Sequence, residues 1–155
     1  IPKRDWSSDV CSSDLLASLL VSLPIAQSQA NANERHSRCN LVSSPRSYQR
    51  LPYASKEYNK RLARHYLYQK YGQCGAQYVC LVKLWDRESG WSVHAHNPSG
   101  AHGIPQSLPG NKMAKFGKDW KTNPSVQISW GLHYIKNRYG SPCNALGHSN
   151  RFGWY

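Results

Sequence analysis

The stretch LWDRESGW, residues 84–91, decides how the chain is interpreted. It closes a segment, 76–88, whose apolar residues recur at helical spacing and form a stripe of Tyr78, Leu81, Val82 and Trp85. Glu88 falls one turn further along this stripe, and Ser89 and Gly90 then end the predicted helix. We expect a carboxyl in this place to be partly desolvated, which raises its pKa and suits a general acid.

The next segment predicts a loop beside that acid. Residues 92–110 contain three prolines and three glycines with no periodic pattern, and include NPSGAHGIPQ at 97–106. An acid at a helix end followed by a glycine-rich, glutamine-bearing loop suits the floor of a sugar-binding cleft.

The rest of the folded region predicts further helices and no strand. Ser55 caps a predicted helix over 56–71, which Gly72 ends, and Asn123 with Pro124 starts another that runs to about Tyr139. The second helix presents on one face Gln127, Trp130, Tyr134 and Ile135. A short helix is predicted over 111–116, and 143–155 is a short aromatic tail. The pattern predicts a mainly α domain over 56–155.

The first 55 residues divide into three segments. Residues 1–14 resemble translated sequencing-adapter DNA, and we expect them not to be natural protein. Residues 15–30 resemble a signal peptide, since the apolar run is too short to span a bilayer and small residues precede a cleavage point after Ala30. Residues 31–55 are polar and basic, and predict a flexible linker.

Four cysteines remain after cleavage at Ala30: Cys39, Cys74, Cys80 and Cys143. In a secreted protein they permit two disulfides in three possible pairings. Their spacing matches no usual zinc pattern. His94 and His96 form a His-x-His pair, which in a loop is more often idle than metal-bound, so we expect no metal and no cofactor.

The formal net charge of +12 predicts an anionic partner or surface. Lysines and arginines are scattered, and no nucleic-acid-binding motif accompanies them, so we expect no nucleic acid as partner.

Carboxylates are scarce, which limits the possible acid–base chemistry. Beyond Ala30 the acids are Glu34, Glu57, Asp86, Glu88 and Asp119. Glu57 lies in the first turn of a predicted helix, where the helix dipole favours acidic side chains. Asp86 points to a different helix face from Glu88. Glycosidases usually need two carboxyls. With one, the substrate must supply the missing group, as N-acetylmuramic acid can through its N-acetyl oxygen and 6-hydroxyl.

A set of ordered motifs carries a family resemblance. They are LWxRESGW (84–91), NPSGA (97–101), GIPQ (103–106), LPGxKM (108–113), DWxTNP (119–124), QIxWGL (127–132) and RYGxPC (138–143). Together they resemble the lytic transglycosylase-like domains of secreted actinobacterial wall proteins, relatives of the soluble lytic transglycosylase and goose-type lysozyme group. The resemblance covers about 78–155 and implies a lysozyme-like fold.

The resemblance also implies roles for particular residues. Glu88 matches the catalytic glutamate, Ser89 the substrate-contacting residue beside it, and Tyr134 the aromatic in the helix that lines the cleft. Gly103 and Gln106 match the Gly-Leu-Met-Gln loop of the wider group. Cys80 and Cys143 lie inside matched motifs, so their disulfide is the first choice, and Cys39–Cys74 is the second.

Two further site residues are predicted. Trp91, beside the glutamate motif, is the best candidate for stacking on a sugar. The wider group's terminal Ala-Tyr-Asn motif, whose tyrosine orients the glutamate, is replaced here by Ala-Leu-Gly-His-Ser (145–149), and we expect His148 to take that role.

The resulting prediction is a secreted, monomeric peptidoglycan lytic transglycosylase without stable membrane insertion. It would cleave the MurNAc–GlcNAc β-1,4 bond of glycan strands in an anionic cell wall and leave 1,6-anhydroMurNAc. One alternative is a muramidase on the same fold, with Asp119 or a loop-held water assisting. Another is a non-catalytic wall-binding or aggregation-promoting protein.

Overall fold

The computed structural model of the chain describes residues 29, 31, 33, 34, 39 and 45–155. The predicted adapter-like leader, 1–14, lies outside the described residues, as does the predicted signal peptide, 15–30, apart from Gln29. Every described residue from Cys39 onward belongs to one unit, which carries all the helices below.

Three helices form where local signals predict them. The Ser55 hydroxyl accepts a hydrogen bond from the Tyr58 N–H at 3.2 Å and so caps α3 (Lys56–Tyr71). α4 (Ala76–Glu88) ends at the acid. α5 (Pro124–Tyr139) begins after Asn123, whose side chain accepts a hydrogen bond from the Ser125 N–H at 2.8 Å. The prediction of a mainly helical chain is confirmed.

Other segments differ from expectation. The tail was expected to be short and aromatic, yet most of it forms α6 (Pro142–Phe152). Ser141 caps this helix by accepting from the Asn144 N–H, and Pro142 follows at the first helical position, the same type of start as in α5. The predicted helix over 111–116 is a 3₁₀-helix, η1 (Gly110–Lys115). A short helix, α2 (Arg46–Gln49), lies in the predicted linker and packs on α3.

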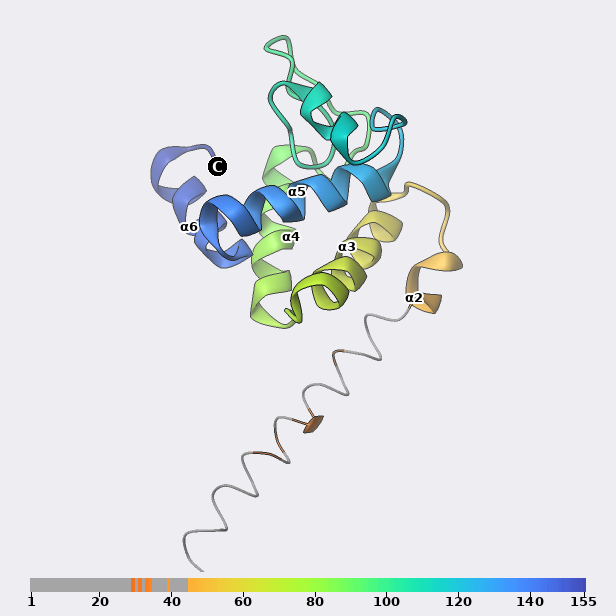
Figure 1. Cartoon of the computed structure of the whole chain (residues 1–155), viewed down its shortest axis with the longest axis vertical. Helices are drawn as coiled ribbons and strands as arrows, with labels where there is room; N and C mark the ends of the chain where they lie inside the picture. The colour runs from red at the N-terminus through yellow and green to blue at the C-terminus, as the bar shows by residue number, and fades with distance from the viewer. Residues whose placement is uncertain (1–28, 30, 32, 35–38, 40–44) are drawn as a thin grey trace, which may run out of the picture. The chain divides into compact units, whose positions relative to one another are not determined.

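The core lies where the four longer helices meet. In Figure 1, α5 lies between α3 and the loop segment 89–123, drawn in green, teal and cyan, with η1 in that loop segment. α4 packs against α3 and α6, and α5 packs against α3, α6 and η1. Buried side chains from all these helices include Leu62, Leu67, Leu81, Trp85, Ile128, Leu132, Ile135 and Ala145. Across the described residues no helix has both the length and the apolar character needed to cross a membrane.

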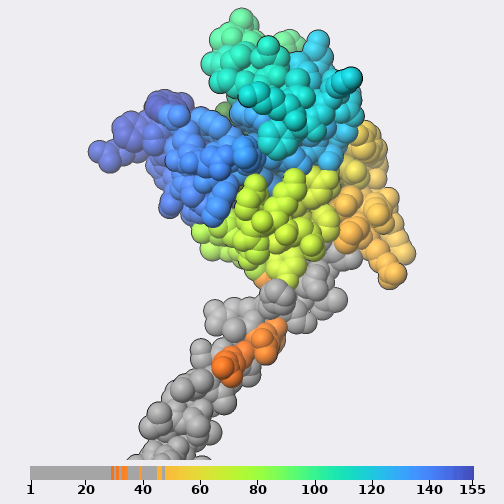
Figure 2. Space-filling view, viewed as in Figure 1, coloured from red at the N-terminus to blue at the C-terminus, as the bar shows by residue number. Residues whose placement is uncertain are grey.

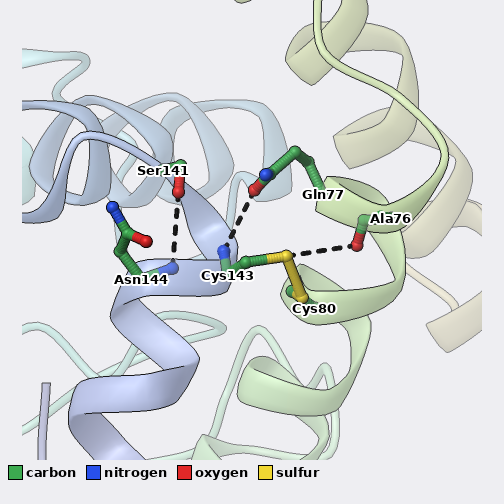
Figure 3. Close-up of a disulfide and its surroundings, with 6 residues drawn as sticks. All are labelled: Ala76, Gln77, Cys80, Ser141, Cys143 and Asn144. Carbon is green, nitrogen blue, oxygen red and sulfur yellow. Dashed lines mark hydrogen bonds between the residues drawn. A yellow bond between two sulfur atoms is a disulfide. The ribbon is translucent and has the colours of Figure 1, made fainter.

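Two disulfides cross-link this unit, with the predicted pairings. Cys80 on α4 is bonded to Cys143 on α6, with 4.9 Å between their Cα atoms (Figure 3). Beside it the Gln77 side-chain oxygen accepts a hydrogen bond from the Cys143 N–H at 3.0 Å, so the two helices are joined at this end twice. Cys39 is bonded to Cys74, between α3 and α4.

Candidate active site

Glu88 is the last residue of α4, and its side chain is half-buried. The two preceding turns of the same helix face carry Leu81 and Trp85, both fully buried. Because this apolar stripe packs into the core, the Glu88 side chain at its end is also partly buried. Burial raises the pKa of the Glu88 carboxyl, and the positive charge of the neighbouring Arg87 offsets only part of this rise. The partial desolvation expected from spacing is present.

The Glu88 carboxyl lines a hollow of ≈ 490 Å³, which we name the Glu88 pocket. Its walls come from α4, from the loop segment and from the chain after α6, and include Glu88, Asn97, Gln106, Leu108, Trp154 and Tyr155. In Figure 2 the C-terminal part of the chain, dark blue at the left, is separated from the teal part of the loop segment at the top. Glu88 is the only carboxylic side chain among the described residues that line this pocket.

Tyr155 joins three parts of the site. Its hydroxyl accepts a hydrogen bond from the Trp85 indole N–H at 2.8 Å and donates one to the Pro105 carbonyl at 2.8 Å. Trp85 lies one turn before Glu88 on α4, whereas Pro105 belongs to the loop. Burial first, and then the negative charge of Glu88, raise the pKa of Tyr155 well above its usual value, so the phenol stays protonated and keeps its donor.

Ser89 and Gly103 hold the loop in place rather than lining the pocket. The Ser89 hydroxyl donates to the Ile104 carbonyl at 2.8 Å and accepts from the Trp91 N–H at 3.1 Å. Gly103 has φ +75°, and a Cβ there would lie 2.4 Å from the side-chain oxygen of Gln127. Only glycine fits this position.

Gln127 of α5, fully buried, organises the loop segment from below. Its oxygen accepts from the Ile104 N–H at 2.9 Å, and its amide group donates to the carbonyls of Val93 at 3.0 Å and Trp120 at 2.9 Å. One side chain therefore satisfies backbone groups from three parts of the loop segment. The Gln106 side chain also bonds to the backbone of the loop segment, because its amide donates to the carbonyls of Ala95 and Gly103.

Tyr134 lies beside a second, smaller hollow of ≈ 90 Å³, which we name the Lys112 pocket. Its ring stacks on Trp130, with centroids 5.3 Å apart and planes at 7°, and meets Tyr155 edge-on at 6.0 Å. Residues of this pocket include Gln106, Leu108, Lys112, Trp130, Tyr134 and Tyr155. Gln106, Leu108 and Tyr155 are shared with the Glu88 pocket, so the two hollows are neighbours.

The structure places Trp91 and His148 away from both hollows. Trp91 is 1% exposed and packs edge-on against Trp85, so it has no free face for a sugar and belongs to the core. The His148 ring contacts the Trp154 carbonyl at 2.9 Å and packs on the rings of Phe152 and Trp154. His148 thus holds the tail that carries Tyr155, and Tyr155 is the residue near Glu88.

Neither of the other acids considered for catalysis lines the Glu88 pocket. Asp86 is exposed on α4 and pairs with Lys56 and Lys60 at 3.1 Å each. Desolvation acts to raise the pKa of Asp86, but hydrogen bonds and charge from the two lysines hold it below its usual value. Asp119 accepts a hydrogen bond from the Asn123 side chain at 2.7 Å, near the start of α5.

Within the described part of the chain, no cluster of three or more histidine, cysteine, aspartate or glutamate side chains could hold a metal ion. His94 and His96 are exposed, and the His96 ring contacts the His94 carbonyl rather than its ring.

Sequence reasoning missed the contributions of Tyr155, Trp154, Asn97 and Leu108. Trp154 is 49% exposed and is the one tryptophan of the Glu88 pocket wall in the described chain. An aromatic pair after Gly153 was the only available signal for Trp154 and Tyr155.

Comparison of the chain with family models, with curated proteins and with solved structures finds no match.

Proposed function

We propose that this chain is a peptidoglycan lytic transglycosylase that cleaves the MurNAc–GlcNAc β-1,4 bond and forms 1,6-anhydroMurNAc. The observation that carries the proposal is the half-buried Glu88 in the Glu88 pocket, with a raised pKa and no second carboxylate among the described lining residues. A lone carboxyl whose pKa is raised suits chemistry in which the substrate provides its own nucleophile.

In this mechanism Glu88 acts twice. Its carboxylic acid donates a proton to the glycosidic oxygen as the C1–O bond breaks, and the substrate's N-acetyl oxygen stabilises the anomeric carbon. The resulting Glu88 carboxylate then accepts the proton of the 6-hydroxyl while that oxygen bonds to C1. Glu88 ends protonated as it began, the GlcNAc end leaves as an alcohol, and no water is consumed.

The surroundings of Glu88 support this assignment. Tyr155 ties the glutamate-bearing helix to the loop through Trp85 and Pro105, which keeps the acid in one place relative to the pocket wall. Trp154 lines the pocket and is half-exposed, so it is a better candidate for contact with a sugar than the buried Trp91, although the Arg138 guanidinium lies over its ring at 5.3 Å.

Action outside the cytoplasm accords with the two disulfides, which persist in oxidising compartments. The net charge of +12 favours an anionic cell wall as the surface on which the protein works.

The test is mass spectrometry of the products formed from purified peptidoglycan, with Glu88→Gln as the control. Anhydro-muropeptides from the wild type, reduced about 10²–10⁴-fold in the variant, are expected because the proton transfers of Glu88 are lost. Reducing-end muropeptides would instead identify a muramidase. Binding without any glutamate-dependent product would identify a wall-binding protein.

A further inference from the structure

The Lys112 pocket lies next to the Glu88 pocket but has a different character. At ≈ 90 Å³ against ≈ 490 Å³, it has room for a substituent rather than for a sugar ring. Because Gln106, Leu108 and Tyr155 border both hollows, a branch of a sugar bound in the larger one can reach the smaller one.

The Lys112 ammonium is the one cationic group of this pocket in the described chain. It donates one hydrogen bond, to the Leu108 carbonyl at 2.6 Å, and an ammonium has three N–H donors. Among the described residues it makes no ion pair with a carboxylate, unlike Lys56 and Lys60, which share Asp86. Lys112 therefore keeps donors and an uncompensated charge at the edge of the pocket.

Aromatic rings form another part of the lining. Trp130 and Tyr134 stack nearly parallel, on successive turns of α5. A cation beside a flat apolar wall fits a short branch that has an aliphatic part and ends in a carboxylate. Charge-assisted hydrogen bonds of the N⁺–H···O⁻ kind are stronger than neutral ones, so such a branch is distinguished from an uncharged one.

We propose that the Lys112 pocket is a specificity subsite that binds a carboxylate-bearing branch of the glycan, with Lys112 as the residue that recognises the charge. The inference rests on the proposed function, since it assigns the substrate class of that same site: muramyl strands with an anionic branch, in preference to neutral N-acetylglucosamine chains. The carboxylate has two possible sources, the lactyl group itself and the peptide stem attached to it.

The experiment measures binding by calorimetry in a Glu88→Gln background of the full chain, which prevents turnover. Three soluble ligands of equal length separate the sources: a glycan with peptide stems, the same glycan stripped of stems so that the lactyl carboxylates are free, and the neutral N-acetylglucosamine tetramer. We expect one or both anionic ligands to bind roughly three- to tenfold more tightly than the neutral one. The tighter of the two identifies the source of the carboxylate.

Matched variants separate the effect of the Lys112 side chain from the effect of removing one positive charge. Lys112→Met is expected to remove the preference and Lys112→Arg to keep most of it. Lys115→Met takes the same charge from an exposed position on the same 3₁₀-helix, outside the pocket, and is expected to keep the preference fully. Equal losses in Lys112→Met and Lys115→Met, or no preference in the Lys112-containing protein, would overturn the proposal.

The subsite and the proposed function can be overturned independently of each other. Anhydro-muropeptides from the wild type without a Lys112-dependent preference would overturn the subsite alone. A Lys112-dependent preference without anhydro products would overturn the transglycosylase reaction and leave the subsite standing.

Discussion

At the scale of single residues, Glu88 combines a catalytic requirement with a cost in stability. Because burial raises the pKa of Glu88, the folded protein holds this proton more tightly than the unfolded chain does. The side chain therefore destabilises the fold above the ordinary glutamate pKa. The free energy of unfolding falls as the pH rises through the window between the ordinary and the raised pKa.

Glu88→Gln should consequently be more stable than the wild type at pH 7, because glutamine needs no proton to remain neutral. The gain in melting temperature should shrink on acidification and disappear below the ordinary pKa of glutamate, where both side chains are uncharged. Thermal unfolding of both proteins from pH 3 to 8 measures this. Glu57→Gln, exposed on the first turn of α3, is the control and should show no such gain. A Glu88→Gln protein no more stable than the wild type at pH 7 would contradict the desolvation of this carboxyl.

At the scale of elements, the position of α4 relative to the loop depends on a few long-range hydrogen bonds. Tyr155→Phe keeps the ring but removes the hydroxyl, and leaves the fully buried Trp85 without an acceptor for its indole N–H. We expect a loss of about 1–3 kcal/mol in the free energy of unfolding, since a buried donor without a partner costs that much. Denaturation in urea measures the loss.

The same substitution should also lower kcat and shift the pH profile of the reaction, because Tyr155 lies near Glu88 and joins its helix to the loop. Tyr53→Phe, at a side chain that is 65% exposed, is the matched control and should leave stability and pH profile unchanged. Equal behaviour of the two variants would show that the Tyr155 hydroxyl does not position the site.

The elements also show which features a sequence can predict. The ends of α3 and α5 are set by residues close by in the chain, so local patterns predict them. Ser55, for example, caps α3 by accepting a hydrogen bond from the Tyr58 N–H. The half-burial of Glu88 follows from the same helical spacing. Ser141 and Pro142 repeat the start signal of α5, yet α6 is not predicted from the sequence, because the aromatic residues of 143–155 are interpreted there as a short tail.

Other parts of the site depend on contacts between distant residues. The Tyr155 hydroxyl meets partners 70 and 50 positions away, and Gln127 reaches loop carbonyls up to 34 positions away. No periodicity encodes such pairings. Trp91 illustrates the reverse case: its place beside the glutamate motif favoured a sugar-stacking role, yet it packs on Trp85 in the core.

At the scale of the whole molecule, the two disulfides offer a matched comparison between stability and function. Cys80 and Cys143 are 63 positions apart and Cys39 and Cys74 are 35 apart, so loop closure predicts about 4 kcal/mol of stabilisation from each bond. Only the first bond holds α6, which leads into the tail that lines the Glu88 pocket.

We therefore expect two double variants, Cys80→Ser with Cys143→Ser and Cys39→Ser with Cys74→Ser, to lose similar free energies of unfolding but to differ in activity. At a temperature where both remain folded, the first should have a lower kcat, because α6 and Tyr155 are no longer fixed covalently to α4. The second should keep kcat near the wild-type value. Urea denaturation and turnover of peptidoglycan, measured on the same preparations, separate the two effects. Equal kcat in both variants would mean that the non-covalent packing of α6 on α4 is sufficient to hold the pocket wall.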